Sequence, residues 1–437
     1  MGSEWQKVAL EELIEPRYGI SYGVVQPGSP TIDGVPIIRV RDVRNGRIST
    51  DDPLRVSPAI EAAYARTRLR GGELLLTLVG TVGETAVVPS ALKGWNVARA
   101  VAVIPVREDI GSYWIQMALR SPLVREIVDS RLNTTVQATL NLRDVAQLPI
   151  VLPPKSEREA IAHILGTLDD KIELSRRMNE TLEAIARALF KSWFVDFDPV
   201  RAKAEGRDTG LPPHIAELFP DSLEDSELGE IPSGWRVGPI LQRAMLLSGG
   251  TPKTERTEFW DGGILWASAK DVSQCGQTFL VSTERTITEK GLDGSATQLI
   301  PAFSTVVVAR GATTGRMALL GQEMAMNQTC YALVSRTESP FALYCQFHYQ
   351  IADLVHAAHG SVFDTITTST FKNTPFLLPS PRLFAQFEEI VTPLFRRILT
   401  SSEQSRSLAA LRDALLPKLL SGEVRVKDAE RMVQPIR

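Results

Sequence analysis

The 437-residue chain contains no run of 18 apolar residues, so its sequence predicts no membrane-spanning helix. The first residues, Met1-Gly2-Ser3-Glu4-Trp5, are polar and lack the pattern of a secretory signal. The three cysteines are an odd number, and their spacing fits no metal site. We therefore expect a reduced, cytoplasmic setting, with all three cysteines filling cores and no metal bound.

Motifs of catalysis are absent as well. The chain has no Gly-x-x-x-x-Gly-Lys-Ser/Thr phosphate loop, and no Gly-x-Gly-x-x-Gly follows a strand-like run. It also lacks the Asn/Asp-Pro-Pro-aromatic motif with which amino-methyltransferases hold a flipped base. Both Pro-Pro pairs, at 153–154 and 212–213, follow a leucine and precede no aromatic residue. Because no nucleophile–base arrangement is recognisable, we predict a non-catalytic chain that reads and organises.

Acidic charge is concentrated in one segment. The whole chain has a net charge of −3, yet residues 196–230 alone hold 3 Lys or Arg against 10 Asp or Glu. Prolines also punctuate this segment, which predicts a connector with short helical pieces such as 215–219. The remainder is close to neutral, so the charge permits a local basic face for nucleic acid without indicating it strongly.

The chain repeats one pattern about 230 residues apart. Trp5 and Trp235 open the two halves, and Asp42-Val43 and Asp271-Val272 each sit in a strand-like run. Further matched pairs are the turns Gly80–Gly83 and Gly311–Gly315, and the runs Pro149–Pro153 and Pro375–Pro379. Such a repeat predicts two similar units with approximate two-fold symmetry, which suits a two-fold partner such as duplex DNA.

Each half is expected to be mixed α/β with many short strands. In the first half the strand-like runs are 35–43, 73–79, 86–89 and 97–106, and residues 112–130 have helical periodicity. In the second half the corresponding strands are 264–269, 305–309, 317–320 and 330–335, with a helix at 341–357.

Two heptad segments give the clearest structural prediction. Apolar residues from Ile161 to Leu189 step by 4 and 3, and adding 226 reproduces the register from Phe387 to Leu415. A polar break at Ser175 and Asn179 matches a break at Ser401 and Ser405. We predict two helices of roughly 30 residues, packed as an antiparallel coiled coil whose polar layer sets the register. The alternative is two unrelated amphipathic helices, each packed on its own domain.

Arginines supply the first candidate DNA contacts. Arg39 and Arg41 alternate with apolar residues, which places both on one face of the expected strand. Arginine suits guanine edges and phosphates, so we select Arg39, Arg41, Arg44 and Arg47. The alternative is a solvated strand face with local pairing to Asp42 and Asp51.

The glycine turns and two polar loops supply the other candidates. Glycines allow close approach of the backbone, and hydroxyls can donate to phosphate, although a plain hairpin turn is the alternative. The loops 134–137 and 360–364 lie at matched positions, and Gln137 can read an adenine edge. The candidates from these segments, with two further lysines, are Thr81, Gln137, Lys253, Lys270, Arg310, Thr313, Thr314 and Arg316.

Several longer runs resemble one known family. They are Ala188-Leu-Phe-Lys-Ser-Trp-Phe-Val-Asp-Phe-Asp-Pro199, Glu227-Leu-Gly-Glu-Ile-Pro-Ser-Gly-Trp235, Ser248-Gly-Gly-Thr-Pro-Lys253, Asn327-Gln-Thr-Cys-Tyr-Ala-Leu333 and Leu415-Leu-Pro-Lys-Leu-Leu-Ser-Gly422. With them the chain resembles, over nearly its whole length, the specificity subunit of type I restriction–modification systems.

The resemblance implies an α+β fold with two pseudo-repeated target-recognition domains, separated by two long helices packed as an antiparallel coiled coil. The domains would be residues 1–153 and 231–380, with helical spacers at 154–195 and 381–423, the connector at 196–230 and a tail at 424–437. Each domain would read one half of a split site in double-stranded DNA, and the helices would set the unread spacer.

The resemblance also implies partners. The helices would dock two methyltransferase subunits, and restriction subunits would join the complex. S-adenosylmethionine would be bound by the methyltransferase subunits, so no cofactor is expected on this chain. Self-association of the isolated subunit stays open. Two rival functions are a DNA-modifying enzyme, which the missing motifs disfavour, and a protein-binding scaffold, which would not need the arginines and paired glycine turns.

Overall fold

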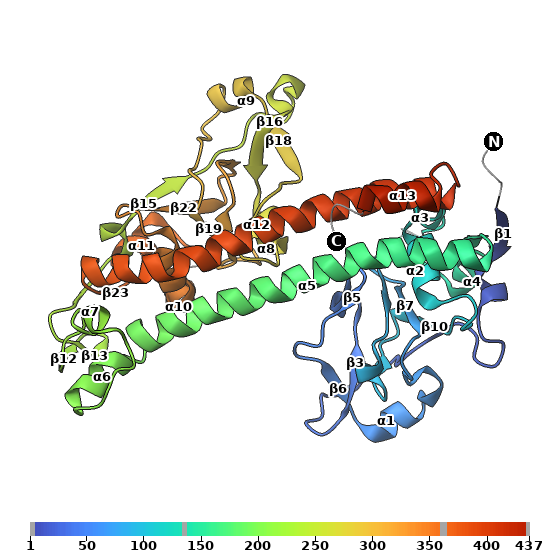
Figure 1. Ribbon diagram of the computed structural model, residues 1–437, viewed down its shortest axis with the longest axis horizontal. Coiled ribbons are helices and arrows are strands. Elements are labelled where there is room, and N and C mark those ends of the chain that lie inside the picture. Colours follow the sequence, from blue (N-terminus) through green and yellow to red (C-terminus); the bar gives the residue numbers. More distant parts are fainter. Residues whose placement is uncertain (1–4, 133–137, 359–364, 434–437) are drawn as a thin grey trace. The chain divides into compact units, whose positions relative to one another are not determined.

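The computed structural model describes residues 5–132, 138–358 and 365–433. The chain divides into two compact units (Figure 1), one made of Met1–Asp170 with Leu408–Arg437 and the other of Lys171–Ser407. Each unit therefore combines one of the two repeated α/β regions with parts of both long helices. We refer to residues 5–153 as the first region and to residues 231–380 as the second region. Among the described residues, no helix has both the length and the apolar character needed to cross a membrane.

The first region is built on short strands. Its four-stranded sheet has the order β2 (Ser21–Tyr22), β10 (Val101–Ile104), β7 (Leu74–Thr77), β8 (Thr85–Val87). A three-stranded sheet has the order β6 (Leu54–Val56), β3 (Val35–Ile38), β9 (Asn96–Val97), and β1 (Gln6–Ala9) pairs with β11 (Pro149–Leu152). The two-stranded ribbon is β4 (Val43–Arg44) with β5 (Arg47–Ile48), and the short helices are α1 (Pro58–Ala62), α2 (Ser112–Arg120), α3 (Pro122–Ser130) and α4 (Leu142–Ala146).

The second region has longer strands in a similar order. Its five-stranded sheet runs β15 (Ala244–Ser248), β22 (Cys330–Ser335), β19 (Thr305–Val308), β20 (Met317–Leu320), β17 (Phe279–Leu280). A three-stranded sheet runs β18 (Arg285–Ile287), β16 (Trp260–Ala267), β21 (Ala325–Met326), and β14 (Arg236–Gly238) pairs with β23 (Phe376–Leu378). The helices are α8 (Ala269–Gln274), α9 (Glu289–Asp293), α10 (Pro340–Ala358) and α11 (Thr368–Asn373).

The pairing of strands confirms the internal repeat. In the first region β3 pairs with β6 antiparallel and with β9 parallel, and in the second β16 pairs with β18 antiparallel and with β21 parallel. The first and last strands of each region, β1 with β11 and β14 with β23, are antiparallel partners. Each region is therefore closed on itself, because its two ends meet in one ribbon.

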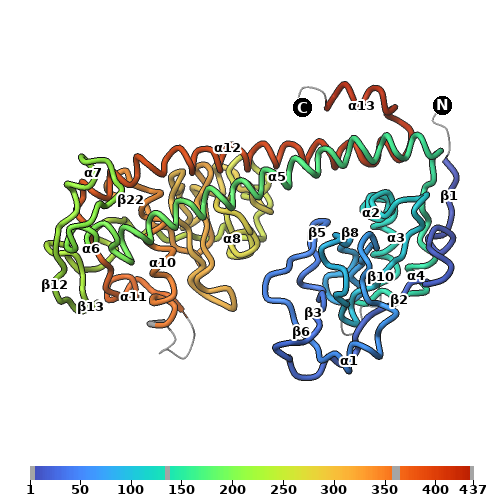
Figure 2. Tube along the Cα trace, turned by 60° about the horizontal axis from the view of Figure 1, so that its bottom comes forward, coloured from blue at the N-terminus to red at the C-terminus, as the bar shows by residue number. Residues whose placement is uncertain are grey.

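The predicted helical segments form two long helices, α5 (Lys155–Phe194) and α12 (Pro381–Leu420), of 40 residues each. The expected length of about 30 residues was too short, because the helices continue beyond the heptad pattern at both ends. Asn179 donates to Ser402 in one unit, and Asp169 contacts Arg412 in the other, as an antiparallel pair of helices requires. In the first unit α2 packs against β7 and β8 and also contacts α5, and in the second unit α10 packs against β19 and β22 and also contacts α12 (Figure 2).

The two regions meet the long helices through different chemistry. In the first unit Tyr113 of α2 donates to Asp169 of α5 at 2.7 Å, and Asp169 also pairs with Arg412 of α12. In the second unit Phe341 of α10 stacks on Phe395 of α12, with ring centroids 4.7 Å apart. A tyrosine–carboxylate hydrogen bond thus contributes to the first junction, and aromatic stacking contributes to the second.

The acidic connector is more structured than the sequence indicated. It holds α6 (Asp198–Ala204), α7 (Pro213–Ala216) and a hairpin of β12 (Leu223–Ser226) and β13 (Gly229–Pro232). Phe197 adopts a left-handed backbone with φ +58°, and its ring packs edge-on against Trp235. The connector therefore belongs to the core of the second unit rather than forming a loose link. The last helix is α13 (Val426–Val433), in the first unit.

Candidate nucleic-acid interface

Two turns of the first region lie side by side. Strands β4 and β5 are joined by Asn45 and Gly46, with φ +51° and +83°, the left-handed pair that a two-residue hairpin needs. The backbone N–H of Asn45 donates to the Glu84 carboxylate at 2.8 Å, and Gly46 forms a bridge with Ala86. The hairpin that carries Arg44 and Arg47 therefore lies against the β7–β8 turn that carries Thr81.

Two arginines that the sequence did not single out join this cluster. Arg125 of α3 donates to the Gly83 carbonyl at 2.7 Å. Arg125 and Arg120 of α2 both line a cavity of about 310 Å³ beside this turn. The exposed Arg44 adds a third guanidinium. Arg120 and Arg125 reach the turn only through the packing of their helices, so no local pattern could have selected them.

The prediction that Arg39 and Arg41 share a strand face was wrong. Strand β3 ends at Ile38, and Val40–Asp42 form a 3₁₀ turn. The Asp42 carboxylate closes that turn, because it accepts from the Arg39 backbone at 2.8 Å and pairs with the Arg39 guanidinium at 2.9 Å. Arg41 lies 3.7 Å from Asp42 and 3.8 Å from Asp52. Local pairing therefore occupies both arginines, with Asp52 in the place expected for Asp51.

The matching aspartate of the second half also sits in a turn rather than a strand. Asp271 lies in the first turn of α8, where its carboxylate accepts from the backbone N–H of Ser268 at 2.9 Å. Asp42 and Asp271 thus perform the same task in the two regions, which is to end a strand and start a short helical turn.

The glycine turn of the second region forms as predicted. Gly311 and Gly315 have φ +93° and +89°, as Gly80 and Gly83 have +78° and +86°, and each pair lies in the turn between two hairpin strands. Arg310, Thr313 and Arg316 are exposed at this turn. The Thr314 hydroxyl donates to the Gly311 carbonyl at 2.7 Å, so its proton serves the turn itself.

Each glycine turn, or the residue just before it, forms a backbone hydrogen bond with a residue that follows a predicted polar loop in the sequence. Gly80 donates its backbone N–H to Ala138 at 3.0 Å, and Ile366 donates to Ala309 at 2.9 Å. The predicted contact Gln137 itself lies outside the described residues. The loop 360–364 lies outside them as well, so only Ala138 and Ile366, which follow the two loops in the sequence, are placed beside the glycine turns.

The two lysines of the second region lie on other elements than the glycine turn, Lys270 on α8 and Lys253 in a loop. Lys270 pairs with Glu284 at 2.6 Å, and Lys253 is exposed in a loop whose carbonyl accepts from the Trp260 indole. Arg285 lies over the Trp260 ring, 3.3 Å from its centroid, in a cation–π contact that the sequence did not indicate. No local pattern links these two residues, which lie on neighbouring strands of one sheet.

These clusters offer the groups that contact nucleic acid. Guanidinium groups and hydroxyls beside open glycine turns can bind phosphates and base edges. No group of His, Cys, Asp and Glu suited to a metal ion occurs among the residues that the structure describes. The arrangement therefore supports recognition, and its chemistry is electrostatic and hydrogen-bonding.

The polar layer of the long helices is largely buried. Asn179, Ser401 and Ser405 are buried, and Ser175 is half-buried. The direct hydrogen bond joins Asn179 Nδ2 to Ser402 Oγ at 3.2 Å, so the partner of Asn179 is a serine that the heptad register did not select. Since this bond is directional, it favours one register of the antiparallel pair.

A buried carboxylate holds the start of α10. Glu388 of α12 accepts the backbone N–H groups of Ala342 at 2.7 Å and Phe341 at 3.4 Å. Burial raises the pKa of Glu388 to about 7 from 4.5, even though these N–H groups favour the charged form. A carboxyl group with a raised pKa stabilises the fold below pH 4.5, and this contribution is lost as the pH rises toward 7.

Replacing Glu388 by Gln is expected to remove this pH dependence. The original protein should lose stability as the pH rises from about 5 to 8, because buried Glu388 must ionise, whereas Gln cannot ionise. The difference in free energy of unfolding, variant minus original, should therefore increase by about 2 kcal/mol over this range. Urea unfolding at both pH values measures the difference. The substitution Glu389→Gln, at the exposed neighbouring position, serves as a control and should show no such trend. A difference for Glu388→Gln that does not change with pH would contradict the assignment.

Comparison with known proteins places the chain in a family. The family described as "Type I restriction modification DNA specificity domain" matches residues 2–184 and 232–400. The type I restriction enzyme HindI specificity subunit of Haemophilus influenzae is 30% identical over 347 residues, which cover 68% of this chain and 73% of that protein. The MjaIX specificity subunit of Methanocaldococcus jannaschii is 24% identical over 373 residues, covering 82% and 78%.

A solved structure shares the fold. The S subunit of a type I restriction–modification system from M. genitalium aligns with a TM-score of 0.50 and 15% identity, covering 95% of this chain and 96% of that one. The family model matches both halves of the chain. These are the halves in which the strand pairing is repeated and to which the two long helices belong. The chain belongs to the type I restriction–modification DNA specificity family, as a non-catalytic specificity subunit.

Proposed function

We propose that the chain directs a type I restriction–modification complex to a bipartite DNA site, with each region reading one half. The observation that carries this proposal is the duplication of the strand pairings together with their glycine turns. Two similar reading surfaces suit two half-sites on a duplex, whose grooves repeat along the helix. The clusters differ in composition between the regions, so each half-site has its own sequence.

The candidate contacts of the first half-site are the β4–β5 hairpin and the β7–β8 turn, which carry Arg44, Arg47 and Thr81. Those of the second half-site are the β19–β20 turn, with Arg310, Thr313 and Arg316, and the exposed loop that carries Lys253. Guanidinium groups at such turns can form paired hydrogen bonds to guanine, and glycine lets the backbone approach phosphate closely. Arg39 and Arg41 are weaker candidates, because both already pair with aspartates.

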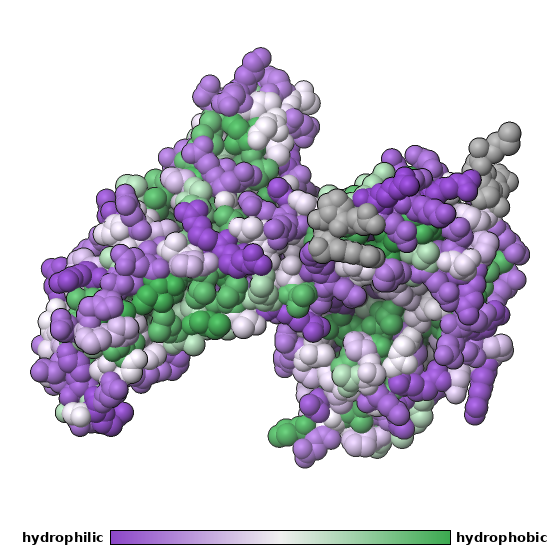
Figure 3. All heavy atoms as spheres, viewed as in Figure 1, coloured by the Kyte–Doolittle hydropathy of each residue, from purple (hydrophilic) through white to green (hydrophobic). Residues whose placement is uncertain are grey.

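The long helices would set the spacer and dock two methyltransferase subunits. Exposed apolar residues along α5 and at its end support docking, since Leu174, Ile185 and Val195 are exposed by 69%, 51% and 42%. Leu174 and Ile185 are 11 residues apart, about three helical turns, so they fall near one face of α5. Figure 3 shows apolar side chains along α5. S-adenosylmethionine and the chemistry of adenine methylation would be supplied by the methyltransferase subunits, and restriction subunits would join them.

Methylome sequencing tests the proposal. A methylation-free bacterial strain would receive this chain with its cognate methyltransferase subunit, and each subunit alone as the control. We expect methyladenine in one bipartite motif only when both are present, because recognition and catalysis reside on different chains. An assembled, stable complex that leaves the genome unmethylated would instead favour a protein-binding scaffold.

A further inference from the structure

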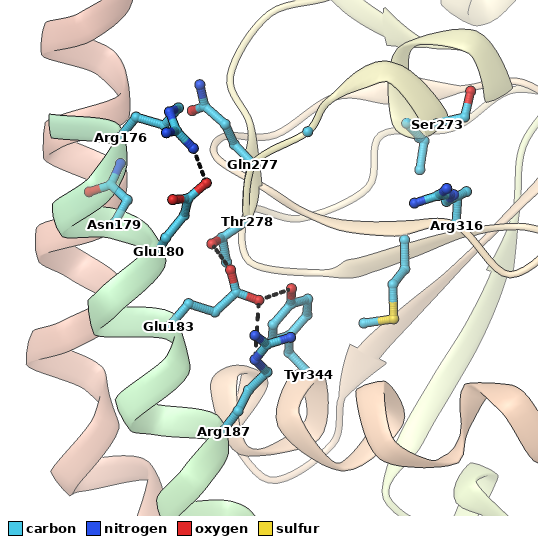
Figure 4. Close-up of a pocket in the computed structure, with 13 residues that line it drawn as sticks. Arg176, Asn179, Glu180, Glu183, Arg187, Ser273, Gln277, Thr278, Arg316 and Tyr344 are labelled. Atoms are coloured by element: carbon cyan, nitrogen blue, oxygen red, sulfur yellow. Dashed lines mark hydrogen bonds and ion pairs between the residues drawn. The ribbon is translucent and has the colours of Figure 1, made fainter. Parts of the chain in front are cut away.

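Glu183 of α5 contacts two separate elements of the second region. Its Oε2 accepts from the Thr278 hydroxyl at 2.6 Å, and its Oε1 accepts from the Tyr344 hydroxyl at 3.0 Å (Figure 4). Thr278 immediately precedes β17, whereas Tyr344 lies on α10. One carboxylate thus joins a long helix to both the edge of the sheet and the helix that covers it.

The surroundings of this carboxylate make its contacts directional and costly to break. Thr278 and Tyr344 are each only 4% exposed, so removal of Glu183 leaves two largely buried hydroxyl groups without their carboxylate partner. The Arg187 guanidinium lies 3.9 Å from Oε1, which balances the charge. All of these residues border a polar cavity of about 360 Å³ that is also lined by Arg316, one of the proposed DNA contacts.

The other attachments of the second region include aromatic packing on α12 and the hydrogen bonds of Glu388, which reach only α10. On α12, Phe395 packs against Phe341, Phe279 and Tyr344. Apolar packing resists separation but permits small shifts at little cost, whereas hydrogen bonds specify one geometry. On α5, Arg187 adds contacts with His348 and Tyr349, and these reach only α10. Of the contacts described here, the Glu183 carboxylate alone joins α5 to both the β17 edge and α10.

We propose that Glu183 is a positioning residue that holds the second region in one orientation on α5 and thereby narrows the range of DNA spacer lengths accepted by the complex. This inference rests on the proposed function. It concerns the region that is proposed to read the second half-site. It adds that spacer selectivity depends on a specific hydrogen-bonded junction between this region and α5, as well as on the length of the helices. The sequence does not indicate this role, because Glu183 has the spacing of an ordinary polar residue on an amphipathic helix.

The test uses the full chain assembled with its methyltransferase subunits. Methylation rates are measured on duplexes that share both half-sites but have the natural spacer or one that is one or two base pairs longer or shorter. Glu183→Ala is expected to raise the ratio of off-length to natural-length rates by about tenfold, since two buried hydrogen bonds are lost. Glu183→Gln keeps a group that can accept from one hydroxyl and donate to the other, and should retain the original ratio.

Two further variants separate positioning from stability. Glu180→Ala removes the same charge one turn earlier on α5, where the side chain is exposed and pairs with Arg176 of the same helix, and should leave the ratio unchanged. The triple variant Glu183→Leu, Thr278→Val, Tyr344→Phe keeps apolar packing without the hydrogen bonds, so it remains informative if Glu183→Ala fails to fold. It should accept off-length spacers as Glu183→Ala does.

The outcomes are distinct. A folded triple variant with the original narrow spacer profile would overturn the role of Glu183, and so would a Glu183→Ala variant that loses stability without any change in the ratio. If the original complex shows no preference for a bipartite site at all, the proposed function fails before the role of Glu183 is reached.

Discussion

Exchanging residues 1–153 for the corresponding region of a relative with another target is expected to replace one half of the methylated motif and leave the other half unchanged. The exchanged segment carries its own sheets, and its first and last strands pair with each other. The hairpin cluster around Arg44 and Arg47 is held mainly by contacts inside this segment, such as those of Asn45 and Arg125. Methylome sequencing of the hybrid with the cognate methyltransferase subunit measures the result.

The design of the hybrid must respect one junction. Tyr113 donates to Asp169 of α5, outside the exchanged segment, so the donor region should also carry a tyrosine there. Exchange of residues 231–380 is the reciprocal control and should alter only the other half of the motif. If either exchange changes both halves, or neither half, the assignment of one half-site to each region is wrong.

Inserting four residues into both long helices is expected to lengthen the preferred spacer by about one to two base pairs. Four helical residues add about 6 Å, and each base pair of duplex DNA occupies about 3.4 Å. The insertions belong after Arg177 and after Glu403, because the bond between Asn179 and Ser402 places these points nearly opposite each other in the antiparallel pair. Methylation rates on a series of duplexes with increasing spacer length reveal the new preference, and activity on the original spacer should fall at least about tenfold.

Two control insertions isolate the effect of length. Four residues added after Gly206, at an exposed position of the connector, should leave the spacer unchanged. The same insertion in α5 alone should destabilise the helix pair, because Asn179 and the apolar positions lose their partners. A doubly extended chain that stays folded and still prefers the original spacer would contradict the proposal that the helices set this length.

The predictable parts of this molecule are those fixed by local pattern. Strands β20 and β22 begin and end where the apolar runs do, and the glycine turns have the left-handed backbone that their residue type favours. The heptads predicted the antiparallel helices because burial on one face leaves a period in the sequence. Local pattern failed at Arg39, where alternation suggested a strand but the Asp42 carboxylate offered the backbone a competing turn.

The unpredicted parts of the candidate site depend on contacts between distant segments. Arg125 reaches the Gly83 carbonyl from a helix 42 positions away, and Glu183 meets Tyr344 across 161 positions. Neither residue differs locally from a solvated helix position. A single sequence records which residues are apolar and which can turn, but it does not record which polar side chains meet after packing.

The aromatic end of α5 has a consequence for the synthesis of the protein. Phe190, Trp193 and Phe194 pack on Phe384 and Phe387 of α12, which follow roughly 190 residues later. At about 5–20 residues per second, translation leaves this end without those partners for roughly 10–40 s. During that interval the nascent chain exposes a large aromatic surface on the ribosome. We therefore expect chaperones that bind exposed aromatic segments to engage it before α12 emerges, and premature termination within the second region to give an aggregation-prone fragment.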